Sequence, residues 1–225
     1  GIFIGPQNTD PEVSVYLQDF VTIAEKLKVF GGLRYTEFET ETDFAFNGFE
    51  FGDTGEDEVV DFSIGAIYNV SPHFNPFVSY MTSTQPQRGV VESGQPLPAQ
   101  EGEQIEAGIK SEWFDGRLRT TLSVFEIEQT DQAQSRQDRQ FSELIGTQET
   151  RGVELEAVGN ITDQFRILAG YSYLDAEFTD SPTGNEGNTP DSVPENKVSL
   201  FGEYALTGAL AGWRVGAGFI HVGDR

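Results

Sequence analysis

Apolar and polar residues alternate with a period of two along most of the chain, and no stretch shows a convincing helical period. Such alternation is typical of β-strands with one apolar and one polar face. The pattern predicts ten strands, several of them longer than the five or six residues usual in soluble sheets. They are residues 12–23, 26–40, 58–70, 75–85, 102–114, 117–130, 145–160, 164–177, 195–206 and 212–224.

The connections between these strands alternate strictly between short and long. The short ones are 24–26, 71–74, 115–116, 162–163 and 207–212. Asp115-Gly116 is a hairpin signal, because Gly adopts the positive φ that a primed turn needs. The long ones are 41–57, 86–101, 131–144 and 178–194, and they are rich in Gly, Pro and polar residues. In an up-and-down meander every long loop then lies at one end, as in transmembrane β-barrels.

The two predicted faces differ in composition, and the apolar one is expected to face lipid while the polar one lines a lumen. The apolar set includes Val13, Val15, Leu17, Leu33, Tyr35, Phe62, Ile64, Ile105, Val153, Leu155, Ala157, Tyr171, Leu200, Tyr204 and Phe219. The polar set is Gln18, Lys28, Arg34, Gln104, Glu106, Lys110, Glu112, Glu154, Glu156, Arg166, Glu203 and Arg214. In residues 117–130, Leu122 and Val124 share one parity while Phe125 and Ile127 share the other, which predicts a bulge near Val124.

Composition narrows the classes of function. The chain has 225 residues, 37 acids and 14 bases, and its net charge of −23 argues against nucleic-acid binding, which needs Lys and Arg to neutralise phosphates. The absence of cysteine excludes disulfides, thiolate metal sites and cysteine nucleophiles. No run of 18 apolar residues predicts a transmembrane helix, and the first residues do not have the pattern of a signal peptide.

Catalysis has little support in the sequence. The carboxylate pairs Glu154/Glu156 and Glu101/Glu103 have a spacing that follows simply from one polar strand face, although a glycosidase also needs two acids. The two histidines, His73 and His221, lack companion metal ligands. We therefore expect neither an enzyme nor a bound metal.

Several stretches resemble the TonB-dependent outer-membrane receptors, and within them the ferric-siderophore receptors. The closest are "EGEQIEAGIKSEWFDGRLRTTLSVFEIEQTD" from Glu101 and "TRGVELEAVGNITDQFRILAGYSYLDAEFT" from Thr150. "VSVYLQD", "LKVFGGLRY", "NPFVSYMTSTQPQRG", "EGNTPDSVPENKVSLFGEY" and "WRVGAGFIHVGDR" follow the family in the same order. The resemblance is specific to the superfamily and says much less about the ligand.

The resemblance implies an all-β fold: an antiparallel up-and-down transmembrane barrel segment, ten strands of a barrel of about 22. It also implies a plug domain that contacts TonB. No plug is recognisable in residues 1–225, so we expect this chain to be an internal segment, a partial receptor barrel lacking the plug and the last strands. Ten such strands alone would leave two unpaired edges in lipid, where unsatisfied backbone groups are costly.

The implied function is uptake: the receptor binds a ferric siderophore outside the cell and imports it with energy from TonB. The candidate ligand contacts are Tyr80, Gln85, Gln87 and Arg88, followed by Arg136 and Arg139. The lumen-facing residues Arg34, Glu106, Lys110, Glu154, Glu156 and Arg166 are expected to form ion pairs between strands or toward a plug. No covalent cofactor is expected.

Other partners and functions remain open at the level of sequence. Outer-membrane lipid and lipopolysaccharide are the expected surroundings of the barrel, and the acidic loops 39–58 and 175–191 could hold Ca²⁺, although neither has the regular calcium-loop spacing. The alternatives are a non-transport β protein for adhesion or scaffolding, or a receptor for haem, cobalamin or oligosaccharide.

Overall fold

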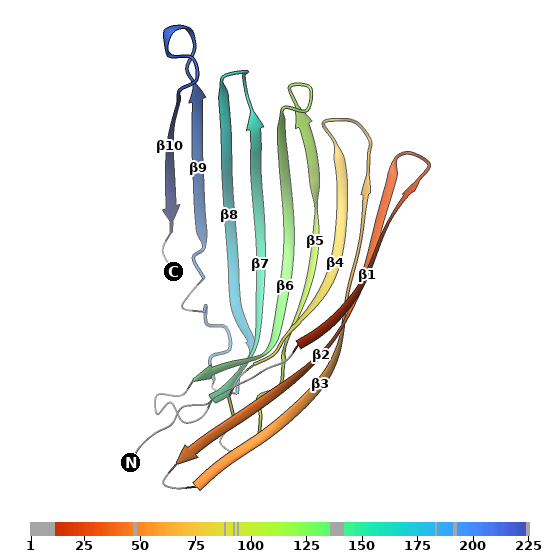
Figure 1. The fold of residues 1–225 in the computed structure, drawn as a ribbon, viewed down its shortest axis with the longest axis vertical. Coiled ribbons are helices and arrows are strands. Elements are labelled where there is room, and N and C mark those ends of the chain that lie inside the picture. Colours follow the sequence, from red (N-terminus) through yellow and green to blue (C-terminus); the bar gives the residue numbers. More distant parts are fainter. Residues whose placement is uncertain are drawn as a thin grey trace.

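Ten antiparallel strands form one curved sheet in the computed structural model (Figure 1). The structure describes residues 12–46, 49–87, 89–91, 93, 95–135, 142–182, 184–190 and 193–223, and the side chains of 40–57 and 135 are outside that description. The strand order is the order in sequence, β1 to β10, as predicted for a meander. The all-β prediction is confirmed.

The strand bounds agree with those predicted to within three residues, except at the end of β2, the start of β3 and the end of β6. They are β1 Glu12–Ile23, β2 Leu27–Phe46, β3 Phe49–Tyr68, β4 Asn75–Gln85, β5 Gln100–Trp113, β6 Leu118–Ser135, β7 Ser142–Asn160, β8 Phe165–Asp180, β9 Asn196–Ala205 and β10 Arg214–Val222. A single 3₁₀ turn, Gly208–Leu210, lies between β9 and β10. In the part of the chain that is described, no helix is long and apolar enough to cross a membrane.

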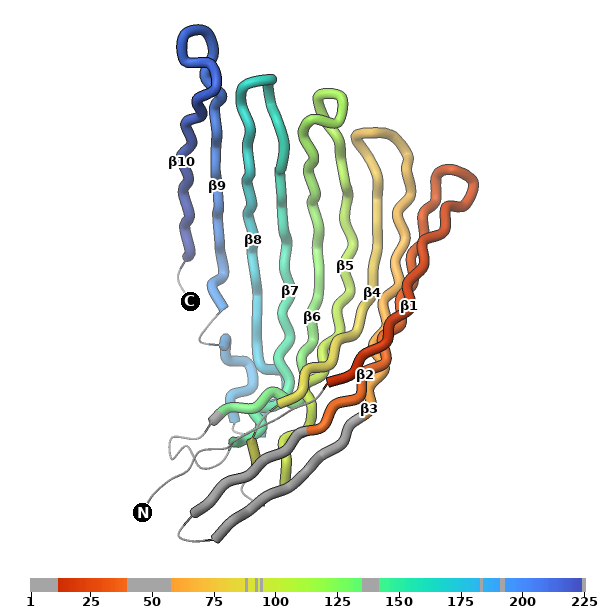
Figure 2. The backbone as a smooth tube through the Cα atoms, in the orientation of Figure 1, coloured from red at the N-terminus to blue at the C-terminus, as the bar shows by residue number. Residues whose placement is uncertain are grey.

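The connections sort to the two ends of the sheet (Figure 2). The connections β1/β2, β3/β4, β5/β6, β7/β8 and β9/β10 lie at one end, here called the turn end. The connections β2/β3, β4/β5, β6/β7 and β8/β9 lie at the other, here called the loop end. Positive φ values at Ala24, Glu25, Asp115 and Gly116 produce two of the tight turns. The predicted segregation of turns and loops is confirmed.

All four predicted long loops are partly strand. Residues 41–46 and 49–57 continue β2 and β3, with Phe46 paired to Phe49, 100–101 begin β5, and 131–135, 142–144 and 178–180 extend β6, β7 and β8. Composition concealed these extensions, because an apolar face indicates where a strand is buried and not where its hydrogen-bonded ladder ends. Polar residues on both faces are compatible with a strand that continues into water.

Cross-strand register assigns the side chains to two faces, because direct partners share a face. On the apolar face Leu17 pairs with Leu33, and Leu33 with Phe62. On the polar face Glu106 pairs with Phe125, and Ser123 with Glu154. The assignment agrees with the two sets predicted from the sequence.

The predicted bulge near Val124 is wrong. The β6/β7 register is continuous from Leu118 to Gln129, so Phe125 and Ile127 lie on the polar face among polar residues. The irregularity lies further along, between Gln129 and Ala133, where Asp131 has a positive φ. The alternation of apolar and polar residues was misleading here, because the apolar side chains of Phe125 and Ile127 lie on the polar face, which also carries Glu106 and Glu154.

Large apolar side chains are exposed rather than gathered into a core. Leu17 is 73% exposed, Phe219 is 59% exposed and Ile64 is 53% exposed. Among the described residues the buried apolar side chains are Phe38, Val90, Leu97 and Ala176. An apolar face this extensive in a single-layer sheet requires an apolar surrounding.

Candidate functional site

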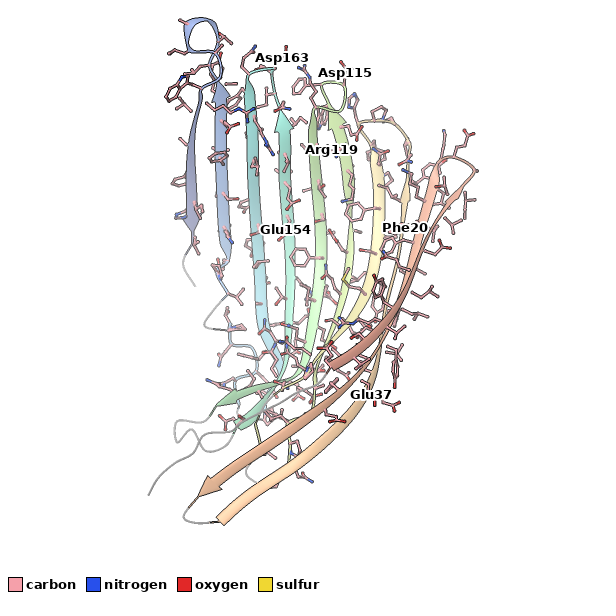
Figure 3. All side chains as sticks on the ribbon, in the orientation of Figure 1. Phe20, Glu37, Asp115, Arg119, Glu154 and Asp163 are labelled. Atoms are coloured by element: carbon pink, nitrogen blue, oxygen red, sulfur yellow. The ribbon has the colours of Figure 1, made fainter. Side chains whose placement is uncertain are left out.

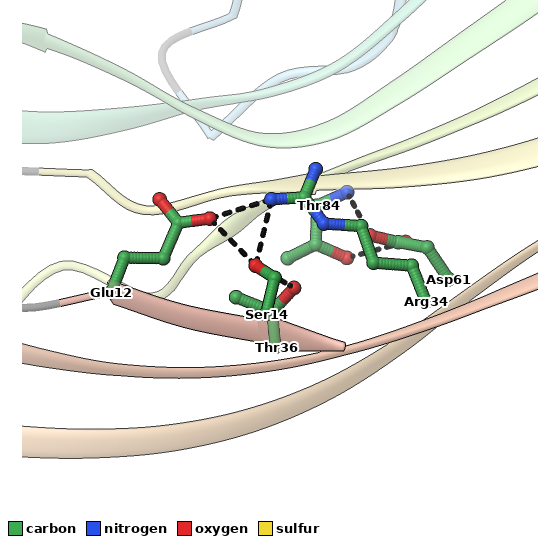
Figure 4. A network of polar contacts seen from close by, with 6 residues as sticks. All are labelled: Glu12, Ser14, Arg34, Thr36, Asp61 and Thr84. Atoms are coloured by element: carbon green, nitrogen blue, oxygen red, sulfur yellow. Dashed lines mark hydrogen bonds and ion pairs between the residues drawn. The ribbon is translucent and has the colours of Figure 1, made fainter. Parts of the chain in front are cut away.

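A small polar recess opens on the polar face where β1 to β4 approach the loop end (Figure 4). Its volume is 180 Å³, and its lining includes Glu12, Arg34, Asp61, Thr84 and Gln85. Four strands contribute because the register brings Glu12 opposite Phe38 and Arg34 opposite Asp61. The recess therefore combines residues that are up to about seventy positions apart in sequence.

Arg34 is the cation of the recess. Its guanidinium lies 2.6 Å from Glu12 Oε1 and donates to Ser14 Oγ at 2.9 Å. Ser14 Oγ is in turn 3.1 Å from Thr36 Oγ1, and Thr36 is buried. The ion pair is half-exposed, so its net contribution to stability is small, but the additional hydrogen bonds fix the direction of the guanidinium.

Asp61 organises the opposite wall. Its carboxylate accepts hydrogen bonds from the Thr84 backbone N–H at 3.2 Å and from Thr84 Oγ1 at 3.0 Å. Thr82 Oγ1 donates to the same carboxylate at 3.3 Å and accepts from the Phe62 backbone N–H at 3.0 Å. These contacts connect β3 to the end of β4, beyond the β3/β4 ladder, which extends from Ser63 to Ile67 on β3.

The two predicted ligand-contact glutamines differ in their surroundings. Gln85 ends β4 on the polar face, pairs with Gln100 and lines the recess. Gln87 donates to the carbonyls of Asp131 and of Pro98, the latter at 2.9 Å, and accepts from the Ala133 backbone N–H at 3.0 Å. Its amide therefore fastens the β4/β5 connection to the bulge of β6, and is already occupied.

Tyr80 lies on the other face. It pairs with Ile64 and Ile105, its ring centroid is 5.4 Å from that of Phe62, and its hydroxyl donates to Glu103 at 2.7 Å. An aromatic ring among apolar neighbours with its hydroxyl directed to an acid is the arrangement of an interfacial anchor. Tyr80 and Gln85 therefore do not contribute to one site.

The other predicted ligand contacts, Arg88, Arg136 and Arg139, lie outside the described residues.

Among the six predicted lumenal residues, Arg34 is the one that forms an ion pair with another described residue. Lys110 instead places its ammonium 4.6 Å from the centroid of the Phe77 ring. Glu106, Glu154 and Glu156 lie on neighbouring rows of the polar face, and Arg166 lies opposite Glu203. Figure 3 shows Glu154 midway along β7.

Sequence reasoning missed Asp61, Ser14 and Thr84, because short polar side chains in strands carry no motif. Only the register shows that Asp61 faces Arg34. It also missed Arg151 on the apolar face, which pairs with Glu126 at 2.9 Å and contacts Glu149. Within the described residues no group of three or more His, Cys, Asp or Glu side chains is placed to hold a metal ion.

A single-layer meander with one apolar face, one polar face and all its tight turns at one end is the wall of a transmembrane β-barrel. Residues 3–225 match the family model described as TonB dependent receptor-like, beta-barrel, and the chain belongs to this family. The family consists of outer-membrane receptors, and this chain is part of an outer-membrane β-barrel.

Characterised relatives are receptors for metal chelates. The chain is 28% identical over 219 residues to the metal-pseudopaline receptor CntO of Pseudomonas aeruginosa, covering 95% of this chain and 31% of that protein. It is 28% identical over 219 residues to the ferrichrome outer membrane transporter/phage receptor of Escherichia coli, covering 96% and 29%. The chain thus spans about a third of the length of these relatives.

The structural comparison agrees. The siderophore receptor PiuA from Acinetobacter baumannii superposes with a TM-score of 0.78 at 26% identity, covering 96% of this chain and 33% of that one. The resemblance noted from the sequence is therefore confirmed at the level of family and fold.

Proposed function

We propose that this chain forms part of the barrel of an outer-membrane receptor that binds a ferric siderophore outside the cell and imports it with energy supplied through TonB. The observation that carries the proposal is the ten-stranded sheet with one apolar face and all its tight turns at one end. Membership of the TonB-dependent receptor family supports a function in ligand binding and uptake for this architecture.

The relatives favour a siderophore as cargo. Those at 27% to 32% identity include receptors for ferrioxamine B, ferrichrome and a ferric pyoverdine. Haem, cobalamin and oligosaccharide remain alternatives within transport, and none of these relatives is named for them. A role in adhesion or scaffolding without transport is not favoured by the comparisons.

The recess at the loop end is the proposed ligand-facing part of this chain. Gln85 offers an amide donor and acceptor, and Arg34, held by Glu12 and Ser14, offers a fixed cation. Amide and guanidinium groups suit the oxygen-rich surface of a siderophore chelate. We assign Tyr80 to the membrane interface, and Arg88, Arg136 and Arg139 stay predicted loop contacts.

The apolar face continues at the loop end into an acidic row. Glu103 pairs with Glu128, Glu128 with Glu149, and Glu149 with Glu177, on four neighbouring strands. We propose that this row meets the headgroups of the outer leaflet and that lipopolysaccharide is a partner there. Calcium at the acidic outer loops stays a prediction.

We further propose that residues 1–225 belong to a longer receptor that has a plug domain and additional strands. The support is the family and the share of its relatives that the chain covers. In such a barrel the polar face of this sheet lines part of the lumen, and the plug is the element through which TonB acts.

Iron-limited growth tests the proposal. A strain that lacks the full-length receptor should lose growth on one ferric siderophore supplied as the sole iron source and recover it with the intact gene. Ferrichrome, ferrioxamine B and a ferric pyoverdine are the first candidates. Unchanged growth on every siderophore, together with no binding of these chelates by the purified receptor, would contradict the proposal.

A further inference from the structure

Three glycines on the polar face each lie directly opposite a phenylalanine on the adjacent strand. The pairs are Phe30 with Gly65, Phe77 with Gly108, and Phe125 with Gly152. In each pair the ring occupies the space that a side chain on the glycine would need: a Cβ at position 108 would lie 2.7 Å from Phe77 Cε1, and the other two rings are closer still. Only glycine therefore fits opposite these rings in the observed register.

The pairs have a regular place in the fold. Each phenylalanine lies on the strand before a loop-end connection and its glycine lies on the strand after it, which gives the strand pairs β2/β3, β4/β5 and β6/β7. Across β9/β10, Phe201 lies opposite Gly218 on the polar face and also approaches Gly216 at 3.0 Å. Across β8/β9, Phe165 approaches Gly202 at 3.2 Å, but this contact is diagonal and lies on the apolar face, where Gly202 is the direct partner of Ile167. The β9/β10 connection, 206–213, is the longest at the turn end.

The strand pairs joined by short turns lack this feature. Among the described glycines, none is covered by a phenylalanine ring across β1/β2, β3/β4, β5/β6 or β7/β8, although Leu174 of β8 also approaches Gly152 at 3.0 Å. Gly31, opposite Asp19 across β1/β2, has open space around its Cβ position. On the polar face, a phenylalanine ring thus covers a described glycine in three of the four loop-joined strand pairs, β8/β9 excepted, and in none of the four pairs joined by the shortest turns.

Register in these pairs needs an additional determinant. A tight turn fixes the register of the two strands that it joins. The Phe and Gly of a pair are about thirty residues apart in sequence, and a connection of that length closes without selecting one alignment. A slip by one residue is prevented because it would turn polar side chains into lipid.

A slip by two residues keeps every side chain on its proper face, so the alternation of apolar and polar residues does not oppose it. The Phe–Gly pairs do oppose it. After such a slip Phe125 would face Thr150 or Glu154, and Phe30 would face Ser63 or Ile67, none of which leaves room for a ring lying flat on the ladder. We propose that the Phe–Gly pairs are register locks, which select the native alignment of the loop-joined strands against two-residue slips.

Cysteine cross-linking tests the lock at β6/β7 in a receptor whose only cysteines are the introduced pair; residues 1–225 contain none of their own. Thr121→Cys with Glu156→Cys reports the native register, since these residues are direct partners. Thr121→Cys with Val158→Cys, or with Glu154→Cys, reports a slip by two, because diagonal positions are too far apart for an unstrained disulfide. The full-length receptor is refolded into phospholipid vesicles and oxidised, and the whole population is analysed.

With the lock intact, the native pair should cross-link and the slipped pairs should not. In Phe125→Ala and Gly152→Ala backgrounds we expect the slipped cross-links to rise about tenfold. Leu122→Ala is the matched control for the phenylalanine, since Leu122 lies on the same strand opposite Leu155 and not opposite a glycine. Gly31→Ala is the control for the glycine. Both controls should give only the native cross-link.

The proposal is overturned if Phe125→Ala and Gly152→Ala leave the slipped cross-links at the level of the controls, whether the variants insert normally or less well. That result would show that the Phe–Gly pairs contribute packing and do not select the register of the strands. If Phe125→Ala inserts too poorly to measure, Phe125→Leu, which keeps an apolar side chain but removes the ring, must raise the slipped cross-links by itself. Because the readout is strand alignment, it does not depend on the cargo of the receptor.

Discussion

The turn end and the loop end of the sheet are organised by different kinds of interaction. At the turn end, local sequence determines the structure: Asp115-Gly116 and Ala24-Glu25 take positive φ values, and β5/β6 stays in continuous register from Trp113 to Glu101. The aromatic rings of His73 and Trp113 stack with centroids 4.8 Å apart, and Trp113 Nε1 donates to Thr120 at 2.9 Å. These side-chain contacts add to an alignment that the turns themselves determine.

At the loop end, side-chain hydrogen bonds and ion pairs between neighbouring strands and connections determine the structure. Asp61 binds Thr84, Gln87 binds the bulge around Asp131, and Arg34 binds Glu12. Carboxylates also gather there, including the directly paired Glu103, Glu128, Glu149 and Glu177. The turn end therefore fixes the alignment of the hairpins, whereas the loop end provides the surface that can vary with the ligand.

The largest expected effect comes from the same substitution at two depths on one strand. Leu122 and Glu128 share the outward face of β6, and Leu122 lies within the apolar band. Leu122→Arg should destabilise the folded receptor by about 2–4 kcal/mol, because a cation at the middle of the bilayer is poorly solvated. Glu128→Arg should be neutral or stabilising, since it separates Glu103 from Glu149 by an opposite charge.

Urea titration of the receptor refolded in vesicles measures both variants. A loss of stability at Glu128 comparable to that at Leu122 would contradict the depth assignment and place the acidic row within the hydrocarbon.

A smaller effect should separate two glycines that have the same backbone conformation. Gly116 has a φ of 79° in the β5/β6 turn, and Gly184 has a φ of 78° in the β8/β9 connection. An alanine at position 116 should cost about 1–2 kcal/mol, because the left-handed conformation is unfavourable and four residues cannot rearrange. Gly184→Ala should cost less than half as much, since its Cβ position is open and a long connection can relax.

Thermal unfolding of the two variants side by side provides the measurement. Equal losses would mean that the connection at the loop end is as constrained as the turn.

The parts of the structure that could be predicted from the sequence divide in the same way, between the turn end and the loop end. Strand number, order, faces and the segregation of turns depend on period-two alternation and on turn residues such as Asp115 and Gly116, which are local signals. The limits of β2 and β3 could not be predicted, because residues 41–57 are rich in glycine and acidic residues and hydropathy does not register a strand that leaves the membrane. The bulge was misplaced from Gln129–Ala133 to Val124 because the change of parity at Phe125 was taken as an irregularity of the strand, whereas Phe125 lies on the polar face and packs on Gly152.

The candidate site was less predictable than the fold. Gln85 was predicted as a ligand contact because it ends a strand at the loop end, but Arg34 and Asp61, which line the same recess, come together only through the register of β2 and β3. Tyr80 was included for its aromatic ring, and its parity, shared with Val78 on the face of Ile64 and Ile105, places it among apolar neighbours. Side-chain type alone does not separate a ligand contact from a membrane anchor.

Binding of the chelate should depend on the loop end and not on the turn end. Gln85→Ala in the full-length receptor should raise the Kd for the cognate ferric siderophore about fivefold, the loss expected for one hydrogen bond of about 1 kcal/mol. Thr121→Ala, in the 670 Å³ recess near the turn end, should leave the Kd unchanged. Intrinsic fluorescence titration compares the two, and an equal loss in both variants would contradict a ligand surface confined to the loop end.

The smallest effects concern one exposed ion pair at each end. Arg34 lies 2.6 Å from Glu12 at the loop end, and Arg117 lies 2.6 Å from Asp163 at the turn end. Replacing either arginine by methionine should change stability by about 0.2–1 kcal/mol, and 1 M salt should reduce both differences because exposed charges are screened. We expect the larger loss at Arg34, since its guanidinium also donates to Ser14, while the Asp163 side chain is 80% exposed. The reverse order, measured by urea titration at low salt, would show that the turn end relies on its charges as well as on its backbone.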